Sequence, residues 1–332
     1  MQKGHSAVLT GLGAWLPPRV VDNDALSQRL DTSDEWIRTR TGIRERRIAD
    51  PDTSTVDMAV QAGANALRSA GSDLVDAVVL ATSTPDYVCP ASAPQVASAL
   101  GLSGIAAFDV NAVCTGFVYA LATGGGLIAG GMADRVLVIG ADVFSRLCDP
   151  ADRGTVPIFG DGAGAVVLRR GLADEPGALG PFDLHSEGDN ADLLIVPAGG
   201  AKQRESDDPR DHYVTMHGQA IFRHACARMA ESARAVLERA GLEIDDVDRF
   251  VAHQANIRIL LATAKQLKLP EDRVVANIGH AGNTSAASIP LALADACEDG
   301  SLQPGHRVLL TAFGAGLTWG STLLTWPDVK PG

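Results

Sequence analysis

The feature of this sequence that most constrains its fold is a pair of matches at one fixed spacing. Arg135–Leu137 and Arg307–Leu309 are identical triplets, and Val75-Asp76 and Val247-Asp248 each follow an Ala-Gly pair. Both matches are separated by 172 residues. Two segments that share one offset predict a chain built from two copies of one unit. Matches this short also arise by chance, so the duplication is a hypothesis at this point.

Glycine and proline residues indicate where the two copies would meet. Five of them lie between residues 170 and 185, near the middle of the 332-residue chain. Such clusters are typical of connections rather than of helices or strands. We therefore expect an N-terminal unit over residues 1–175 and a C-terminal unit over residues 176–332.

Strand-like apolar runs alternate with helix-like stretches in both units. The expected strands are Ala77–Ala81, Ala106–Val110, Val136–Ile139 and Phe250–Ala252, and the expected helices include Met58–Ser69 and Ala225–Arg239. This alternation favours an α/β fold in which helices cover sheets with mostly parallel strand pairing.

The stretch 110–133 contains no charged residue and is long enough to cross a bilayer. It also contains six glycines and lies between two strand-like runs. Because a helix that is apolar on all sides is equally typical of a protein core, we predict a buried helix here and no membrane partner.

Charge and cysteine usage exclude several classes of protein. The net charge is −12, and nucleic acids and anionic membranes bind basic surfaces, so neither is an expected partner. The five cysteines form no Cys-x-x-Cys pair and the histidines form no H-E-x-x-H pattern, so we predict neither a disulfide framework nor a metal site. No apolar leader-like run is found at the N-terminus, and the expected location is the cytoplasm.

Cys114 is the first candidate for chemistry. It follows the strand-like run 106–110 and precedes the glycine-rich helix. The N-terminus of a helix favours a thiolate, lowers the pKa of a cysteine, and offers N–H groups that can hold an oxyanion. Cys114 is therefore a candidate nucleophile, and the alternative is a small buried apolar residue.

The duplication brings two further polar residues into the same hypothesis. The offset of 172 carries Cys114 to Ala286, three residues after Asn283, and His253 ends a strand-like run of the second unit. A cysteine, a histidine and an asparagine that converge there would suit acyl transfer. Taken singly, His253 is better interpreted as a core histidine and Asn283 as a turn residue.

Glycine-rich loops offer a competing hypothesis, a phosphate site at Gly160–Gly164 or Gly11–Gly13. The first loop leads into a strand-like run rather than a helix. The acidic residue that would bind the ribose of a dinucleotide does not follow at the required distance. A dinucleotide site is therefore disfavoured.

Taken together, these segments resemble the beta-ketoacyl-acyl-carrier-protein synthase III family of the thiolase superfamily. The resemblance rests on motifs along nearly the whole chain: 32–37, 39–44, 109–116, 153–155, 159–165, 253–256, 282–285 and 312–320. It implies a five-layer αβαβα sandwich of two duplicated halves, working as a homodimer without a metal or organic cofactor.

The resemblance also implies a two-stage reaction. Cys114 would take an acyl group from acyl-CoA, and malonyl-acyl carrier protein would then lose carbon dioxide and attack that group. His253 and Asn283 would stabilise the developing enolate, Ala315 would contribute a backbone N–H to the oxyanion hole, and Phe313 would lie near the departing carboxylate. The product would be a 3-oxoacyl carrier protein that begins fatty-acid or polyketide synthesis.

Binding residues follow from the same resemblance. Trp36 and Arg153 would hold the adenine of CoA, with Arg40 near its phosphates. Carrier protein is acidic, so a chain with net charge −12 needs a local basic patch, and the matching residues are Arg223, Arg258 and Lys265.

Three departures from the family pattern concern the acyl group. Cys89 replaces the usual phenylalanine in the segment that reaches the partner subunit's pocket, and Pro157 replaces an aliphatic residue. Phe159 is the expected pocket residue in this chain's own half of the site. Ala315 replaces a glycine. A smaller Cys89 predicts a longer pocket and a branched, medium-chain or unusual starter group.

Two other functions remain open from the sequence. One is a same-fold acyltransferase that moves an acyl group to a hydroxyl or amine without decarboxylation. The other is a non-catalytic acyl-CoA-binding protein, which predicts no acylation of Cys114. A degradative thiolase is disfavoured because Cys297 lies outside the 312–320 loop, where a second catalytic cysteine would be required.

Overall fold

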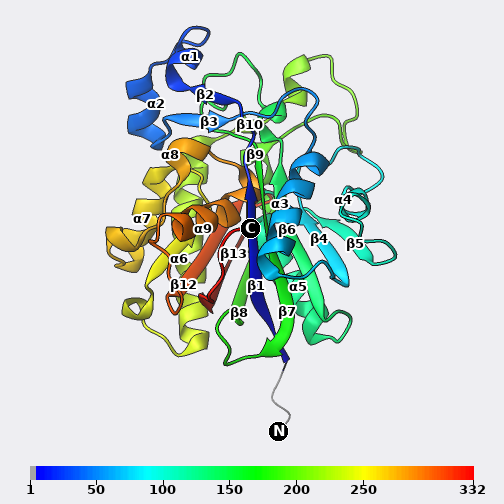
Figure 1. Ribbon diagram of the computed structural model, residues 1–332. Helices are drawn as coiled ribbons and strands as arrows, with labels where there is room; N and C mark the ends of the chain where they lie inside the picture. The colour runs from blue at the N-terminus through cyan, green and yellow to red at the C-terminus, as the bar shows by residue number, and fades with distance from the viewer. Residues whose placement is uncertain (1–4) are drawn as a thin grey trace.

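A computed structural model describes residues 5–332 as two β-sheets with helices between and around them (Figure 1). The larger sheet has the strand order β1-β7-β6-β4-β5. Its strands are β1 (His5–Trp15), β4 (Ala77–Ala81), β5 (Ala106–Val110), β6 (Arg135–Asp142) and β7 (Gly162–Leu172). The second sheet has the order β11-β12-β13-β8. Its strands are β8 (Leu179–Ser186), β11 (Arg249–Ala252), β12 (Arg307–Gly314) and β13 (Thr318–Thr325).

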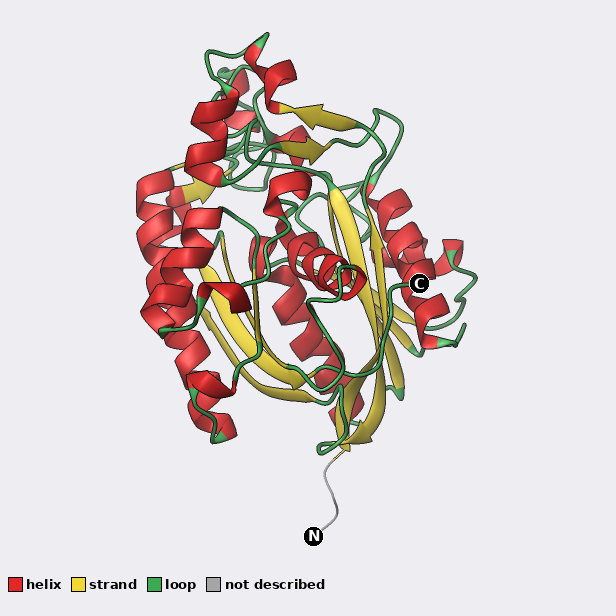
Figure 2. Ribbon diagram, turned by 60° about the vertical axis from the view of Figure 1, so that its left-hand side comes forward, coloured by secondary structure: helices red, strands yellow, loops and turns green. Residues whose placement is uncertain are grey.

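The helices complete five layers. Between the sheets lie α5 (Gly116–Ala129) and α9 (Ser288–Glu298), as Figure 2 shows. The outer face of the larger sheet is covered by α3 (Thr55–Ala70) and α4 (Ala93–Ala99), and that of the second sheet by α6 (Gly218–Ala240) and α7 (Ile257–Leu267). The smaller elements are α1 (Asn23–Ser27), α2 (Asp34–Thr41), α8 (Ile278–Ala281), and the pairs β2 (Val20–Asp22) with β3 (Glu45–Arg47) and β9 (Leu194–Ile195) with β10 (Thr215–Met216).

The predicted duplication is visible in the positions of the elements. β6 and β12 begin 172 residues apart, as do α5 and α9, and so do the 3₁₀ turns η1 (Val113–Thr115) and η7 (Ser285–Ala287) that precede these two helices. The Ala-Gly pairs found in the sequence end α3 and α6, where Gly71 and Gly241 have φ of 60° and 66°. These left-handed ends favour glycine because it lacks a Cβ.

The expected helices and strands are present, but the expected strand pairing is wrong in part. β4 pairs in parallel with β5 and β6, and β11 pairs in parallel with β12. The remaining pairs of the two sheets are antiparallel. Between β12 and β13 the connection has only three residues, too short for the crossover that a parallel pair needs.

The glycine-rich stretch forms the buried helix that its composition predicts. α5 packs between the two sheets, and no helix in residues 5–332 combines the length and apolar character needed to cross a bilayer. Residues 1–4, part of the segment considered for a leader, lie outside the described residues.

Candidate active site

Cys114 lies in η1, at the point where the chain passes from β5 into α5. Cys114 is 4% exposed. Val113 beside it has φ of 46°, and its counterpart Ser285 in η7 has φ of 51°, so both halves use the same unusual turn before their central helix. The two turns contact each other between the sheets.

The protonation state of Cys114 differs from the sequence-based expectation. Burial raises the pKa of its thiol to about 12, the Ser285 side chain opposes this shift, and Asp142 adds to it. Burial is the largest of these effects, so the thiolate expected from the sequence is not the resting form. The thiol carries its proton at neutral pH.

His253 follows the end of β11 and is held at two points. Its backbone N–H donates to the Thr311 carbonyl at 2.9 Å, and its Nδ1 lies 2.7 Å from the Ser288 hydroxyl. The residue is 3% exposed, and burial lowers the pKa of the imidazole to about 3. The ring is therefore neutral at physiological pH, and within the described part of the chain Nε2 is its nitrogen without a hydrogen-bond partner.

Asn283 is fixed through both its backbone and its side chain. Its N–H donates to the Ile158 carbonyl and its carbonyl accepts from the Gly160 N–H, each at 2.9 Å. The Ser285 N–H donates to Oδ1 at 2.9 Å. Since a backbone N–H can only donate, this contact identifies the oxygen and leaves Nδ2 as the side chain's free donor.

Asp142 joins the two halves beneath these residues. It is fully buried at the end of β6, and its Oδ1 accepts from the hydroxyls of Ser83 and Thr84 and from the Ser83 N–H, at 2.7–3.1 Å. Its Oδ2 accepts from the Ala286 N–H in η7 at 3.1 Å. Burial raises the pKa of this carboxyl. We infer that Asp142 holds η7, and with it Asn283, against the first half.

A single cavity of about 630 Å³ contacts Cys114, His253, Asn283 and Phe313. The sequence-predicted trio is thus brought together, although its members come from η1, the end of β11 and the segment before η7. The cavity extends to Trp36, Arg40 and Arg153, the residues expected to hold CoA. It therefore links the candidate nucleophile to the candidate CoA site.

Aromatic residues form part of the cavity wall. Phe159 is 2% exposed and stacks on Phe144 with ring centroids 4.3 Å apart. Phe313, at 4% exposed, also lines the cavity. Ala315 lies in the loop between β12 and β13 and packs against the cluster that contains Phe159, while its neighbour Gly314 lines the cavity.

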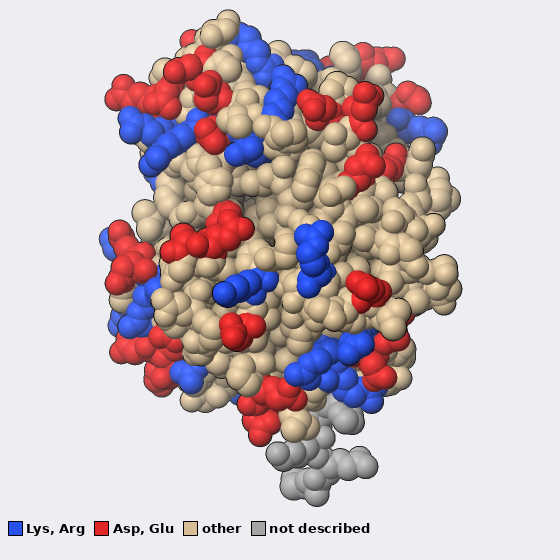
Figure 3. Space-filling model, viewed as in Figure 1, with Lys and Arg blue, Asp and Glu red and all other residues tan. Residues whose placement is uncertain are grey.

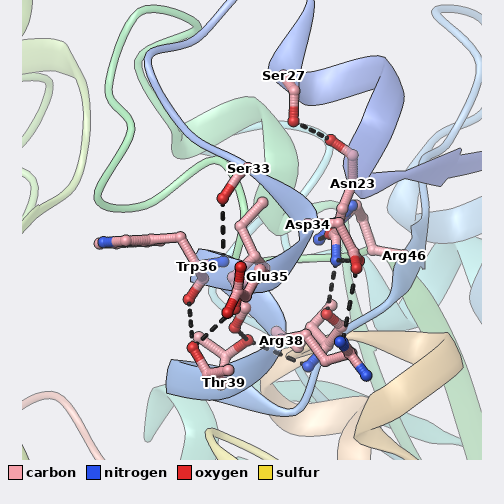
Figure 4. A network of polar contacts seen from close by, with 12 residues as sticks. Asn23, Ser27, Ser33, Asp34, Glu35, Trp36, Arg38, Thr39 and Arg46 are labelled. Atoms are coloured by element: carbon pink, nitrogen blue, oxygen red, sulfur yellow. Dashed lines mark hydrogen bonds and ion pairs between the residues drawn. The ribbon is translucent and has the colours of Figure 1, made fainter.

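Two guanidinium groups lie close to the Trp36 ring. The Cζ atoms of Arg40 and Arg153 are 4.7 and 5.1 Å from its centroid. Ser33 caps α2 by accepting from the Trp36 N–H at 3.1 Å, as Figure 4 shows. This geometry leaves an aromatic face flanked by positive charge, which suits a purine nucleotide.

A buried network that the sequence analysis missed anchors the helix carrying Trp36 (Figure 4). Arg46 is 1% exposed and donates to Asn23 Oδ1 at 2.7 Å. Asn23 Nδ2 in turn donates to Asp34 at 2.8 Å, in the first turn of α2. No local pattern reveals this network, because its members come from three separate elements.

Arg223, Arg258 and Lys265 are exposed on α6 and α7. Arg223 and Arg258 also line the cavity. In the described part of the chain, none of the three forms an ion pair with a carboxylate. Elsewhere basic and acidic side chains are interspersed, as on the face in Figure 3.

Cys89 is not part of the cavity within one chain. It is exposed in the segment between β4 and α4, beside Val88, which is 92% exposed. Among the described residues, no three His, Cys, Asp or Glu side chains are grouped so as to hold a metal ion.

Known proteins resemble this chain over almost its full length. Residues 108–188 match the model of 3-oxoacyl-(acyl-carrier-protein) synthase III, and residues 237–326 match its C-terminal model. Beta-ketoacyl-(acyl-carrier-protein) synthase III 5 of Streptomyces coelicolor is 56% identical over 327 residues, 98% of each chain.

Solved structures agree with these matches. The 3-oxoacyl-(acyl carrier protein) synthase III of Pseudomonas aeruginosa superposes with a TM-score of 0.93 at 53% identity, covering 98% of this chain and all of the other. The priming beta-ketosynthase of the R1128 polyketide pathway has a TM-score of 0.91 at 36% identity, covering 99% of this chain and 98% of the other. The architecture is that of the condensing enzymes of the thiolase superfamily. Within that superfamily, the chain belongs to the beta-ketoacyl-acyl-carrier-protein synthase III family, and it is a condensing acyltransferase.

Proposed function

We propose that this enzyme carries its acyl intermediate on Cys114 and works in two stages. Acyl-CoA first transfers its acyl group to the thiol, and malonyl-acyl carrier protein then takes that group to give a 3-oxoacyl carrier protein. The observation that carries the proposal is the meeting of Cys114, His253 and Asn283 in one cavity. The stages themselves need no metal or organic cofactor, and we place them in the cytoplasm.

In the first stage His253 accepts the thiol proton. Because the thiol and the imidazole are both neutral at rest, the proton moves to Nε2 as Sγ attacks the thioester carbonyl. The backbone N–H groups of Cys114 and Ala315 stabilise the oxyanion. The carbonyl carbon then loses its bond to the CoA sulfur, which takes the proton from Nε2.

In the second stage His253 and Asn283 act as donors. The bond between the methylene and carboxylate carbons of the malonyl group breaks, and carbon dioxide leaves. The electron pair becomes an enolate, whose oxygen accepts from Nε2–H and from Asn283 Nδ2. The enolate carbon attacks the acyl group, the bond from the acyl carbon to Cys114 Sγ breaks, and the departing thiolate takes a proton from solvent in the cavity. Phe313 keeps the departing carboxylate in apolar surroundings.

We propose that CoA enters along the part of the cavity that contains Trp36. Adenine would stack on the Trp36 ring with Arg153, and Arg40 would face the phosphates. The ion pair of Arg153 with Asp31 at 2.9 Å would not compete strongly, because the Asp31 side chain is 97% exposed.

The carrier protein would dock on the exposed cations Arg223, Arg258 and Lys265. Two of these line the cavity, so a carrier bound there could insert its thioester toward Cys114. Their lack of carboxylate partners in the described chain leaves them available to an acidic protein.

We further propose a homodimer whose two chains join at β5. Among the strands of residues 5–332, β5 is an edge of the larger sheet and pairs only with β4. The same dimer would bring Cys89 of each chain toward the partner's acyl pocket. Within each chain, we propose that the two units divide at residues 175 and 176, between β7 and β8.

The condensation stage is tested with Asn283→Ala and with Asn283→Asp, which keeps the size of the side chain. Removing the Nδ2 donor should lower carbon dioxide release from malonyl-acyl carrier protein by 10²–10³-fold, as for other oxyanion donors. Acylation of Cys114 should persist. Unchanged carbon dioxide release in both variants would contradict the role of Asn283 and favour transfer without decarboxylation.

A further inference from the structure

Among the described residues, the ring of His253 has one side-chain hydrogen-bond partner, the hydroxyl of Ser288. Oγ lies 2.7 Å from Nδ1, and the Gln254 N–H also donates to this oxygen at 3.4 Å. Ser288 begins α9 and is 1% exposed. Within residues 5–332 no carboxylate forms an ion pair with His253, so no fixed charge holds the ring in one protonation state.

The proposed function makes opposite demands on Nε2, and the inference below rests on that function. In acylation Nε2 must be bare, because it accepts the thiol proton. At the end of that stage it has passed the proton to CoA, and the ring keeps its proton on Nδ1. In condensation Nε2 must carry a proton, because it donates to the enolate oxygen.

Only some hydrogen-bond partners of Nδ1 allow Nε2 to be bare in one stage and protonated in the other. A backbone N–H beside Nδ1 would permit only the tautomer with Nε2–H, and a carbonyl oxygen would permit only the tautomer with Nδ1–H. A hydroxyl can accept from Nδ1–H or donate to bare Nδ1 by rotating its proton. Neither tautomer then leaves a buried ring nitrogen without a partner, which would cost free energy.

We propose that Ser288 is a positioning residue that lets His253 exchange between its two neutral tautomers between the stages. During acylation Ser288 accepts from Nδ1–H. After acylation the ring exchanges protons with solvent in the cavity: Nε2 takes one proton from solvent, Nδ1 gives one up to solvent, and the Ser288 hydroxyl then donates to Nδ1. The ring has the same net protonation before and after this exchange.

The contrast with Asn283 supports this division of roles. The Ser285 N–H holds Oδ1 of Asn283 in one orientation, so Nδ2 is a donor in every stage. The first half has no equivalent of Ser288, because the residue 172 positions earlier is Gly116. The adjustable hydroxyl thus occurs on the half that supplies the histidine.

The first test is spectroscopic and uses the unmodified enzyme. With ¹⁵N-labelled histidine, the ring nitrogen signals of His253, assigned with His253→Asn, are compared before and after acylation of Cys114. We expect the proton population to move from Nδ1 toward Nε2 on acylation. The same single tautomer in both states would overturn the inference.

The second test uses Ser288→Ala and Ser288→Thr, with Ser232→Ala as a matched control. Ser232 lies on α6, outside the site, and is also 1% exposed; its hydroxyl donates to the backbone carbonyl of Asp183 in β8 at 3.3 Å. Loss of the Ser288 hydroxyl should lower the rates of both stages at saturating substrate by at least about tenfold, with little change in KM. Threonine should restore most of each rate, and the control should leave both unchanged.

The outcomes separate this inference from the proposed function. Full rates in folded Ser288→Ala, or an equal loss in Ser288→Thr with unchanged thermal stability, would overturn the role of Ser288. Failure of the wild-type enzyme to acylate Cys114 would instead contradict the proposed function. If Ser288→Ala does not fold, the tautomer measurement on the unmodified enzyme still decides.

Discussion

Desolvation sets the protonation of the two titratable residues that would exchange a proton. Burial raises the pKa of Cys114 to about 12 and lowers that of His253 to about 3. Both shifts favour the neutral form, so the resting pair is a thiol and an imidazole. Proton transfer must then accompany attack on the thioester, and the nucleophile is formed only when a substrate is present.

The resting state of Cys114 can be tested by its alkylation rate with iodoacetamide. Because the thiolate is the reactive form and its pKa is about 12, the rate should rise about tenfold per pH unit from pH 7 to pH 9 without a plateau. Peptide mass spectrometry measures the rate at Cys114, and the exposed Cys89 reports reagent activity. A plateau below pH 8 would mean that the helix N-terminus outweighs burial.

At the scale of elements, close contact between the halves fixes the position of the nucleophile. β12 ends at Gly314, and a Cβ added there would lie 2.9 Å from the Cys114 backbone nitrogen and 3.1 Å from its Cβ. The Thr115 hydroxyl also donates to the Thr318 carbonyl at 3.0 Å. η1 is therefore fixed against the end of the β12–β13 hairpin.

This contact predicts the effect of Gly314→Ala. The added methyl group should displace Cys114 and lower its acylation rate by at least about tenfold, since small misplacements of reacting groups are costly. The matched control is Gly126→Ala on α5, where an added Cβ meets nothing within 4 Å. Alanine should stabilise that helix by roughly 0.5–1 kcal/mol and keep activity. Normal acylation in folded Gly314→Ala would contradict this account of the contact.

How much the sequence predicts also differs between elements. Apolar runs place β4, β5 and α5, and the repeat places Cys114 opposite the Asn283 turn. The antiparallel pairing of β7 and β13 is missed because apolar content does not specify strand direction. Ser288 and Asp142 are missed because their contacts join residues 35 and 144 positions apart, and no local pattern encodes such pairs.

At the scale of the whole molecule, the edge of the larger sheet points to assembly. Every residue of β4 is buried, whereas β5 is partly exposed throughout. Tyr87 and Val88, in the segment that also carries Cys89, are 59% and 92% exposed. Unpaired sheet edges and exposed apolar side chains are typical of surfaces that another chain covers.

The proposed homodimer predicts the effect of Val88→Asp. A charge buried in the interface should shift the protein from dimer toward monomer in sedimentation velocity. Met132→Asp is the control, because Met132 is 69% exposed beyond the end of α5. A dimer that persists in Val88→Asp, or a monomeric wild-type protein at micromolar concentration, would contradict this interface.

The most direct test of the central claim is intact-protein mass spectrometry of the acyl intermediate. The enzyme and Cys114→Ala are incubated with a panel of straight and branched acyl-CoAs, and malonyl-acyl carrier protein is then added. We predict one acyl mass on the unmodified enzyme, none on Cys114→Ala, and loss of that mass as 3-oxoacyl carrier protein forms. An acyl group that forms in both proteins, or that persists while the condensation product accumulates, would contradict the account.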